Sequence, residues 1–308
     1  MTPYNLHFTH STGLTDENGY SYWPAPVKLN LELRVLGNRA DGYHNLQTLF
    51  QLLNIGDELW IKPNMTGQLE LITDYQEVAN EDNLVIQAAQ ALITKAEKHQ
   101  LGATIKLNKR MPSGAGLGGG SSDAASTLVA LNTLWGLNLS NFELCTIGEQ
   151  LGADIPVFVH GYSAWAEGIG EILTAAKLPQ KHYLIVYPEC SINTGKIFSH
   201  PALTRDDKPI KLRASRSEVD LESLGYNAFQ PLVAELYPEV KEALEFLNQY
   251  GKAMLTGTGS CVFLTFDNKR EASKISALCK QRWLTLEAQG INTSPLIEEF
   301  KNRGIAKR

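Results

Sequence analysis

The sequence is poor in cysteine, has no long apolar run and shows no excess of positive charge over its 308 residues. Its four cysteines are far apart and form no CxxC pair, which indicates reduced, mostly buried thiols rather than a disulfide framework or a zinc site. No apolar run approaches the ~18 residues that a membrane-spanning helix needs. Residues 1–22 contain no Lys or Arg and no apolar centre, so a signal peptide is not indicated. These absences predict a cytoplasmic protein without a membrane partner.

The charge balance is slightly acidic, with 28 Lys and Arg against 33 Asp and Glu, a formal net charge of −5 and a pI near 5.8. Such a surface repels polyanions at long range, which argues against nucleic acid as a partner. It still permits a phosphorylated small molecule, because one local positive pocket overcomes a weak overall field. Since 43% of the residues are apolar and 20% charged, the chain can pack one large domain or two of ordinary size.

The chain begins with a segment that shows no regular period. Residues 1–22 have neither helical nor strand spacing, which predicts a mobile or loosely docked extension.

From Val27 to Val35 apolar and polar residues alternate, and this alternation predicts a half-buried strand whose polar face is solvated. Lys28 and Asn30 share that polar face, roughly 6.6 Å apart by strand rise.

The remaining elements predict a mixed α+β chain. A helix is expected over residues 83–100, with Asn80 or Asp82 as its cap. Ser140 to Glu143 has capping-box spacing and opens a helix that Gly152 ends. Strands are expected at 103–107, 183–187 and 261–266, and further helices at 124–135, near 235–250 and at 271–280.

The most unusual stretch is residues 113–123, SGAGLGGGSSD, where five glycines occur among seven residues. Fixing so many glycines in a regular element is entropically costly, so an irregular loop is expected, with Ser121 or Ser122 capping the helix after it. The free N–H groups of such a loop can face an anion, with the positive helix end behind them. Anion binding is therefore favoured over a purely structural turn.

Two common nucleotide motifs fit this loop poorly. Gly114, Gly116 and Gly119 match GxGxxG, but a second helix follows the first where a dinucleotide site needs a strand ending in an acid. Gly120 stands where the lysine of the GxxxxGK[ST] phosphate loop belongs. A helix end contributes at most ~0.3–2 kcal/mol toward an anion. A triphosphate therefore needs cations from elsewhere: Mg²⁺, and lysines such as Lys109, which is equally well explained as a solvated strand-end lysine.

The other chemical groups are weak signals when each is taken alone. Asp154 follows a helix end, where an Asp is usually a cap or turn residue. The turn at Tyr43 and His44 combines an aromatic ring with an imidazole, and a histidine there is usually a surface or packing residue. Thr256 to Ser260 forms a second glycine–hydroxyl turn, either a hairpin turn or another phosphate-facing loop. The histidines show no HExxH spacing, so a metal hydrolase is not indicated.

Taken together and in this order, five segments resemble the GHMP small-molecule kinases over about Pro24 to Leu296. They are Pro26–Leu31, Arg39–His44, Pro112–Asp123, Leu151–Pro156 and Thr256–Ser260. The resemblance implies an α+β, two-domain GHMP kinase fold. Residues 23–176 would form an ATP-binding domain like ribosomal protein S5 domain 2, residues 177–308 a ferredoxin-like substrate domain, and residues 1–22 an extension.

The blocks around His44 and Asp154 narrow the resemblance to one branch of the family. That branch uses ATP to phosphorylate the 2-hydroxyl of 4-diphosphocytidyl-2-C-methyl-D-erythritol in the non-mevalonate isoprenoid pathway. On this resemblance Asp154 is the catalytic base and Lys28 the cation beside it, and a carboxylate with a nearby ammonium is what phosphoryl transfer requires. Mg²⁺ is implied by the chemistry, with Ser121 or Ser122 as a source of one oxygen.

The same resemblance assigns the binding residues. For the nucleotide it names Asn83 and Lys109 near adenine, and around the phosphates Pro112, Ser113, Gly114, Ala115, Gly116, Leu117, Gly118, Gly119, Gly120, Ser121 and Ser122. For the substrate, Tyr43 and Phe198 would sandwich the cytosine, His44 would bond its edge, and Asn30 and Thr194 would contact it.

Other hypotheses stay open at this stage. The same fold could serve homoserine, mevalonate or a sugar as the phosphoryl acceptor, or the chain could bind nucleotide as a sensor without turnover. An NAD-dependent oxidoreductase is the least favoured, because of the helix that follows the first one. A monomer or a weak homodimer is expected.

Overall fold

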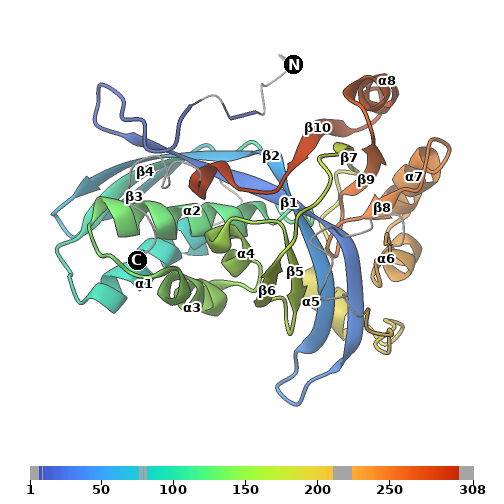
Figure 1. Ribbon diagram of the computed structural model, residues 1–308, viewed down its shortest axis with the longest axis horizontal. Coiled ribbons are helices and arrows are strands. Elements are labelled where there is room, and N and C mark those ends of the chain that lie inside the picture. Colours follow the sequence, from blue (N-terminus) through green and yellow to red (C-terminus); the bar gives the residue numbers. More distant parts are fainter. Residues whose placement is uncertain (1–6, 9, 76–78, 80–81, 211–223, 298–308) are drawn as a thin grey trace.

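The computed structural model describes residues 7, 8, 10–75, 79, 82–210 and 224–297. Two long antiparallel strands, β1 (Ser21–Asn38) and β2 (His44–Asn64), run through the molecule and end in a hairpin that projects from one side (Figure 1). The pairing register shifts at three points along β1, and such bulges bend a strand and increase its twist. Residues of these two strands belong to the apolar cores at both ends of the molecule.

The other strands extend this ribbon into a ten-stranded sheet with the path β3-β4-β2-β10-β7-β9-β8. Every neighbouring pair is antiparallel except β3 and β4, and β5 and β6 branch from β2. The strands are β3 (Leu69–Thr73), β4 (Gly102–Asn108), β5 (Ala164–Glu167), β6 (Ile172–Ala175), β7 (His182–Tyr187), β8 (Met254–Leu255), β9 (Val262–Phe266) and β10 (Leu284–Ile291).

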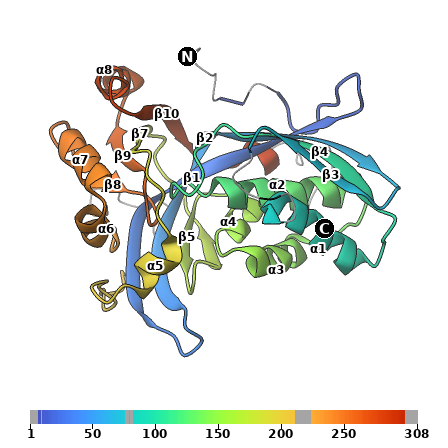
Figure 2. The ribbon, with the colours of Figure 1, turned by 180° about the vertical axis from the view of Figure 1, so that it is seen from behind.

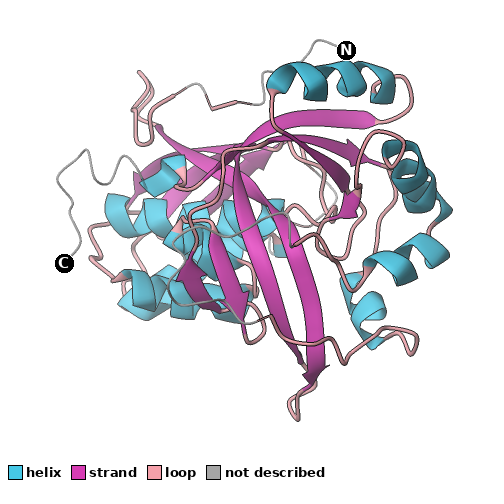
Figure 3. Cartoon of the chain, turned by 45° about the vertical axis from the view of Figure 1, so that its right-hand side comes forward, coloured by secondary structure: helices cyan, strands magenta, loops and turns pink. Residues whose placement is uncertain are grey.

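The helices form two groups at opposite ends of the sheet (Figures 1 and 2). The first group packs on the β1–β4 part of the sheet and comprises α1 (Leu84–Ala96), α2 (Gly119–Leu134), α3 (Asn141–Leu151) and α4 (Ile155–His160). The second covers the β7–β10 part and comprises α6 (Gln230–Leu236), α7 (Pro238–Leu247) and α8 (Lys269–Cys279). The short α5 (Thr194–Ser199) lies beside the β1–β2 hairpin, as Figures 1 and 3 show.

Most predicted elements are present, and local chemistry explains their ends. Ser140 accepts from the backbone of Glu143, whose side chain accepts in return from Ser140, so the predicted capping box opens α3. Asn83 caps α1 through the N–H of Val85. The prediction of Asp82 as that cap is wrong, and Asn80 lies outside the described residues.

The helix expected near 235–250 is present as α7, but it begins at Pro238, because residues 235 and 236 end a separate helix, α6. Tyr237 adopts φ −126° and ψ 95°, and Pro238 begins α7. A residue before proline is disfavoured in helical conformation because the proline ring clashes with its backbone, so the chain turns at Tyr237.

The polar face of β1 is buried, contrary to the expectation from alternation. Lys28, Asn30 and Glu32 have almost no exposed surface. The loop before α2 packs over Lys28, which donates its backbone N–H to the carbonyl of Leu117 at 3.0 Å. At the other end of this face, Glu32 accepts from the N–H groups of Gly225 and Tyr226 at 2.9 and 3.0 Å. Alternation identifies which residues share a face, but it does not reveal what covers that face.

The N-terminal segment is more firmly docked than its sequence predicts. Ser21 and Tyr22 already belong to β1, and Tyr22 is fully buried. Asp16 holds the preceding turn by accepting from the N–H groups of Asn18 and Tyr20 at 2.9 and 2.8 Å. Thr12 donates to the carbonyl of Pro295 at 2.9 Å. Residues 1–6 and 9 of the expected extension lie outside the described residues.

None of the helices within the described ranges has the length and apolar character that crossing a bilayer requires.

Candidate active site

The ammonium of Lys28 lies at the centre of the site. Its Nζ is 2.6 Å from Asn30 Oδ1, 3.0 Å from the carbonyl oxygen of Gly116 and 3.3 Å from Asp154 Oδ2. A lysine ammonium has three donors, so these three acceptors fix its position. The side chain is 3% exposed, and its Nζ lies over the ring of Phe50, 5.4 Å from the ring centroid. The sequence-predicted pair Lys28 and Asp154 is therefore brought together.

Asp154 differs from its partner in exposure. It occupies the residue before α4, directly after the turn in which Gly152 ends α3. Its side chain is 35% exposed, against 3% for Lys28. The carboxylate therefore has one side on the buried ammonium and the other toward solvent, where an alcohol group can approach it.

The glycine loop depends on residues without a side chain. Gly114, Gly116 and Gly118 have φ of 61°, 79° and 72°, a left-handed conformation that other residues rarely adopt. A Cβ on Gly116 would lie 2.1 Å from the carbonyl oxygen of Thr256. All three glycines thus give the chain a backbone direction that other residues rarely adopt, and Gly116 also permits a close backbone contact.

The loop passes into α2 earlier than expected. Gly119 and Gly120 are helical, and Gly118 precedes the helix without a side-chain cap. The prediction of a serine cap is wrong, because the helix begins at Gly119 and both Ser121 and Ser122 lie inside its first turn. Ser122 is fully buried and donates to the carbonyl of Pro26 at 2.6 Å. The first turn of any helix leaves its N–H groups without partners inside the helix. Those of Gly119 to Ser121 can therefore bind an anion.

The second glycine turn packs directly on the first. Residues 256–260 connect β8 to β9, so the turn belongs to a hairpin. Thr256 Oγ1 donates to the carbonyl of Gly116 at 3.2 Å and accepts from the N–H of Asn30 at 3.1 Å. Cys261 donates its N–H to Ala115 at 3.1 Å. The two turns and β1 thus form one connected group of backbone atoms around Lys28.

Lys109 is not a free cation in this structure. Its Nζ lies 2.5 Å from Asp57 Oδ2 and 2.7 Å from Asp123 Oδ2, with 9% of the side chain exposed. Burial alone lowers the pKa of Lys109, but the two carboxylates outweigh it and the net shift is upward. Burial is the main cause that raises the pKa of Asp123.

The buried group sits beneath the start of α2. A Cβ on Gly119 would lie 3.1 Å from Lys109 Nζ and 3.3 Å from Asp57 Oδ2. Asp57 also accepts from the N–H groups of Arg110 and Met111, at 2.6 and 2.8 Å. The predicted contact of Lys109 with a nucleotide stays a prediction. In the structure, Lys109 pairs with Asp57 and Asp123 beneath the glycine loop and the start of α2.

Asn83 lies near the same loop. It caps α1, and a Cβ on Gly120 would contact the side chain of the next residue, Leu84, at 3.7 Å. The starts of α1 and α2 are therefore neighbours, with Asn83 at the edge of the loop.

The residues predicted for a cytosine gather at the β1–β2 hairpin and α5. Tyr43 is 58% exposed in the hairpin turn. The ring of His44 lies 5.2 Å from that of Phe198, centroid to centroid, and Phe198 packs on Phe229 at 4.7 Å. Burial lowers the pKa of His44, and the charge of Arg205 lowers it further. A neutral imidazole beside aromatic rings suits a flat heterocycle.

Two further predicted substrate residues already have protein partners. The amide of Asn30 accepts from Lys28 and donates to Thr48 at 2.8 Å. Thr194, the first residue of α5, shares a hydrogen bond of 2.9 Å with Thr258 in the second glycine turn. Both predictions remain untested. Thr194 and Thr258 link the α5 region to the glycine loops.

Arg205 was not predicted, although its Nε donates to His44 Nε2 at 3.0 Å. The two residues are 161 positions apart, and no local pattern marks a single arginine as the partner of a distant histidine. Only tertiary structure reveals such a contact.

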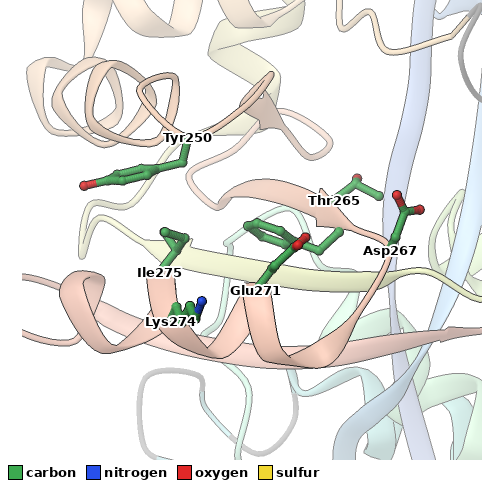
Figure 4. Close-up of a pocket in the computed structure, with 7 residues that line it drawn as sticks. Tyr250, Thr265, Asp267, Glu271, Lys274 and Ile275 are labelled. Carbon is green, nitrogen blue, oxygen red and sulfur yellow. The ribbon is translucent and has the colours of Figure 1, made fainter.

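Two surface hollows contain none of the predicted site residues. One lies between α1 and α3, where Phe142 is strongly exposed. The other lies between β9 and α8 and is bordered by Tyr250, Asp267 and Ile275 (Figure 4). Within the described ranges, no group of three or more His, Cys, Asp or Glu could hold a metal ion.

Models of a known family match both halves of the chain. The model of the GHMP kinases N terminal domain matches residues 83–162, and that of the GHMP kinases C terminal domain matches residues 208–283. The first includes the glycine loop and Asp154.

Curated relatives match nearly the whole chain. A 4-diphosphocytidyl-2-C-methyl-D-erythritol kinase of Pseudomonas paraeruginosa is 49% identical over 273 residues, 89% of this chain and 95% of that protein. The protein of the same name from Vibrio cholerae is 48% identical over 290 residues, 94% of this chain and 98% of its own.

Solved structures agree in fold. A crystal structure of 4-(cytidine 5'-diphospho)-2C-methyl-D-erythritol kinase is 31% identical, with a TM-score of 0.75, and covers 87% of this chain and 98% of that one. The mevalonate kinase of Methanococcus jannaschii is 16% identical with a TM-score of 0.67, covering 90% of this chain and 100% of its own. At that identity the likeness concerns the fold alone.

Proposed function

The chain belongs to the GHMP kinases, and from that premise we propose that it transfers the γ-phosphoryl group of ATP to the 2-hydroxyl of 4-diphosphocytidyl-2-C-methyl-D-erythritol. It has the two-domain α+β fold of that family and is an ATP-dependent small-molecule kinase. Relatives of this name at 48–49% identity support the substrate. The observation that carries the chemistry is the contact of 3.3 Å between Lys28 and Asp154 beside the glycine loop.

In the transfer step Asp154 accepts the proton of the acceptor hydroxyl. The hydroxyl oxygen forms a bond to the γ-phosphorus, and the bond from that phosphorus to the bridging oxygen of ADP breaks. Phosphoryl transfer depends mainly on position and on stabilisation of charge. Lys28 serves both needs, since its fixed ammonium holds the carboxylate and lies near the charge that develops.

The glycine loop binds the phosphates in this proposal. The N–H groups of Gly119 to Ser121 lie at the positive end of a 16-residue helix. Mg²⁺ would bind together with the triphosphate, because it is usually held by phosphate oxygens and only one or two protein groups. Ser121 is the half-buried hydroxyl on this turn and can offer one oxygen, whereas Ser122 already donates inside the core. The ion supplies charge neutralisation on the phosphates.

The base-binding end of the substrate lies at the hairpin. Tyr43 and Phe198 stack on the two faces of the cytosine, and His44 bonds its edge. Stacking on an aromatic ring contributes ~1–3 kcal/mol per base in single-stranded nucleic acid complexes. The exposure of Tyr43 supports this role, because an exposed tyrosine ring can take up a flat partner.

The test is a comparison of acceptors with the purified full chain, ATP and Mg²⁺. ADP release is followed with 4-diphosphocytidyl-2-C-methyl-D-erythritol, methylerythritol 4-phosphate, homoserine, mevalonate and galactose. Only the cytidyl substrate is expected to give rapid turnover, and phosphorus NMR of the product should show a new phosphomonoester. Equal rates with an acceptor that lacks the cytidyl group would contradict the proposed substrate. No ADP release with any acceptor would contradict the kinase.

The chain is expected to act on its small-molecule substrate as a monomer or weak homodimer. Sedimentation velocity at several protein concentrations measures this directly.

A further inference from the structure

Arg205 is held in one orientation by the segment that follows α5. Its NH1 group donates to the carbonyl of Leu203 at 3.0 Å. Its NH2 group donates to the carbonyls of Phe198 and His200 at 2.7 and 2.8 Å. Because these bonds occupy the outer end of the guanidinium, the Nε–H is left to point in a fixed direction.

The Nε–H of Arg205 meets His44 across the gap between the hairpin and α5, at 3.0 Å from His44 Nε2. A guanidinium only donates and does not lose its proton in proteins, so His44 Nε2 has to accept. A neutral imidazole carries one proton, and the bond at one nitrogen decides which nitrogen has it. His44 is therefore protonated at Nδ1.

We propose that Arg205 is a positioning residue for substrate selection: by fixing His44 as the Nδ1–H tautomer, it makes His44 a hydrogen-bond donor to the edge of the bound base. This inference rests on the proposed function, since it takes His44 as the residue that contacts the pyrimidine. Arg205 itself acts through His44.

A donor at this place distinguishes the two common pyrimidines. The ring N3 of cytosine accepts a hydrogen bond, whereas N3 of uracil carries a hydrogen. A fixed Nδ1–H therefore pairs with cytosine and opposes a hydrogen on uracil. A mismatched pair of donors leaves both without a partner in a partly buried site, which is costly. The tautomer of His44 thus contributes to the choice of a cytidyl group.

The charges around His44 are few. Among the described residues, the charge that acts on its pKa is that of Arg205, in the segment after α5. In the hairpin, Arg39 and Asp41 pair with each other at 3.0 Å, and Phe198 on α5 is uncharged. Protonating His44 would remove the acceptor at Nε2, so both the charge and the hydrogen bond of Arg205 favour the neutral ring.

The test compares 4-diphosphocytidyl-2-C-methyl-D-erythritol with its uridyl analogue as substrates of wild type and Arg205→Met. The ratio of kcat/KM for the cytidyl over the uridyl substrate is expected to fall on the order of tenfold, mainly through KM. Arg205→Lys keeps the charge and can still donate to the carbonyls, but it has no Nε–H. The same direction of change is expected for it, and an unchanged ratio in both variants would overturn the proposal.

A double-mutant cycle distinguishes an effect of Arg205 on substrate selection from a purely structural role in the segment after α5. His44→Phe keeps a ring and removes both nitrogens. If Arg205 acts through His44, Arg205→Met lowers the selectivity ratio in the wild-type background and not in the His44→Phe background. An equal fall in both backgrounds would show that Arg205 acts without His44 and would overturn the proposal.

Acidic pH supplies a second readout. Below pH about 6.5 the imidazole of a histidine without Arg205 takes up a second proton, and imidazolium donates from both nitrogens. The KM defect of Arg205→Met for the cytidyl substrate should therefore shrink between pH 7.5 and 6, relative to wild type. A defect that stays constant would indicate a purely structural role and contradict the proposal.

The tautomer can also be measured without any substrate. Nitrogen NMR of the chain labelled at histidine ring nitrogens is expected to show Nδ1–H for His44 in wild type and a shift toward Nε2–H in Arg205→Met. Nε2–H in wild type would overturn this inference whatever the enzyme phosphorylates. If instead wild type has the Nδ1–H form but does not phosphorylate the cytidyl substrate, the proposed function fails and the tautomer assignment stands.

Discussion

Two lysine–carboxylate groups lie on either side of the start of α2, and they differ in nearly every respect but their residue types. Lys28 meets one carboxylate, that of Asp154, and two uncharged oxygens. Lys109 meets two carboxylates, those of Asp57 and Asp123. The side chain of Asp154 is 35% exposed, whereas those of Asp57 and Asp123 are 0% and 3% exposed.

This difference suits the Lys28–Asp154 pair to chemistry and the Lys109 group to structural support. A carboxylate that exchanges a proton with a ligand needs one side open and needs a partner that stays fixed when its own charge changes. Asp154 has both, because the two uncharged oxygens hold Lys28 independently. The buried group has no open side, and its three charges sum to −1. A charge group of that kind is typical of a structural element that is costly to disrupt.

The largest effect is expected from Asp154→Asn. The amide occupies the same space but cannot accept the proton of the acceptor hydroxyl, so kcat should fall roughly 10²–10⁴-fold. Since Asp154 lies at the surface side of the pair, the melting temperature should change little. Steady-state assays with thermal denaturation check both. A kcat near that of wild type would remove Asp154 from the role of base and leave a positional mechanism.

Lys109→Met tests the opposite side of the comparison. Removing the Lys109 ammonium leaves the buried carboxylates of Asp57 and Asp123 without this cation, which costs about 3–5 kcal/mol of unfolding free energy. Urea unfolding at pH 7.5 measures this. A loss below about 1 kcal/mol, combined with a raised KM for ATP, would assign Lys109 to the nucleotide and not to support of the loop.

Lys28→Met is the matched control for that variant. It removes a buried lysine of the same shape, but the carboxylate it leaves is partly solvated. The remaining acceptors, Asn30 Oδ1 and the carbonyl of Gly116, are uncharged, so the expected cost is about 1–3 kcal/mol. The loss of kcat, expressed as activation free energy, should exceed the loss of unfolding free energy. If both lysine variants were equally destabilised, the distinction between the two groups would not hold.

The sequence predicts the elements of the fold better than the environment of their faces. Alternation over 27–35 and the capping box at Ser140 are local patterns, and the corresponding strand and helix are present. The burial of Lys28, Asn30 and Glu32 depends on segments from far along the chain. The loop before α2 covers Lys28, the turn at Thr256 contacts Asn30, and the backbone N–H groups of Gly225 and Tyr226 donate to Glu32. The periodicity of the strand does not show which distant segments bury its polar face.

The site shows the same division. The glycine loop stands out by composition, and the resemblance to a family joins Lys28 to Asp154, which the structure places in contact. Spacing does not reveal the partners of Lys109 or the bond from Arg205 to His44, because each joins residues that are distant in sequence. The structure supplies those contacts, and both concern how a predicted residue is held.

Asp123→Asn gives the smallest effect and tests the excess charge of the buried group. Burial raises the pKa of Asp123 to about 7 in the folded chain, against 3.8 for an ordinary Asp. The folded state then holds this proton more tightly than the unfolded state, so stability falls as pH rises from about 4 to about 7. Asparagine does not ionise and can accept from Lys109 and donate to Asp57.

The variant should therefore be more stable than wild type by roughly 1–2 kcal/mol at pH 7.5, and the gain should shrink toward zero near pH 4. Urea unfolding of both proteins across this range measures the difference. Because Asp154 is untouched, kcat at pH 7.5 should stay within about twofold of wild type. A variant that is less stable at every pH would mean that Asp123 is ionised and paired with Lys109 throughout. The two lysine groups would then differ in exposure but not in charge balance.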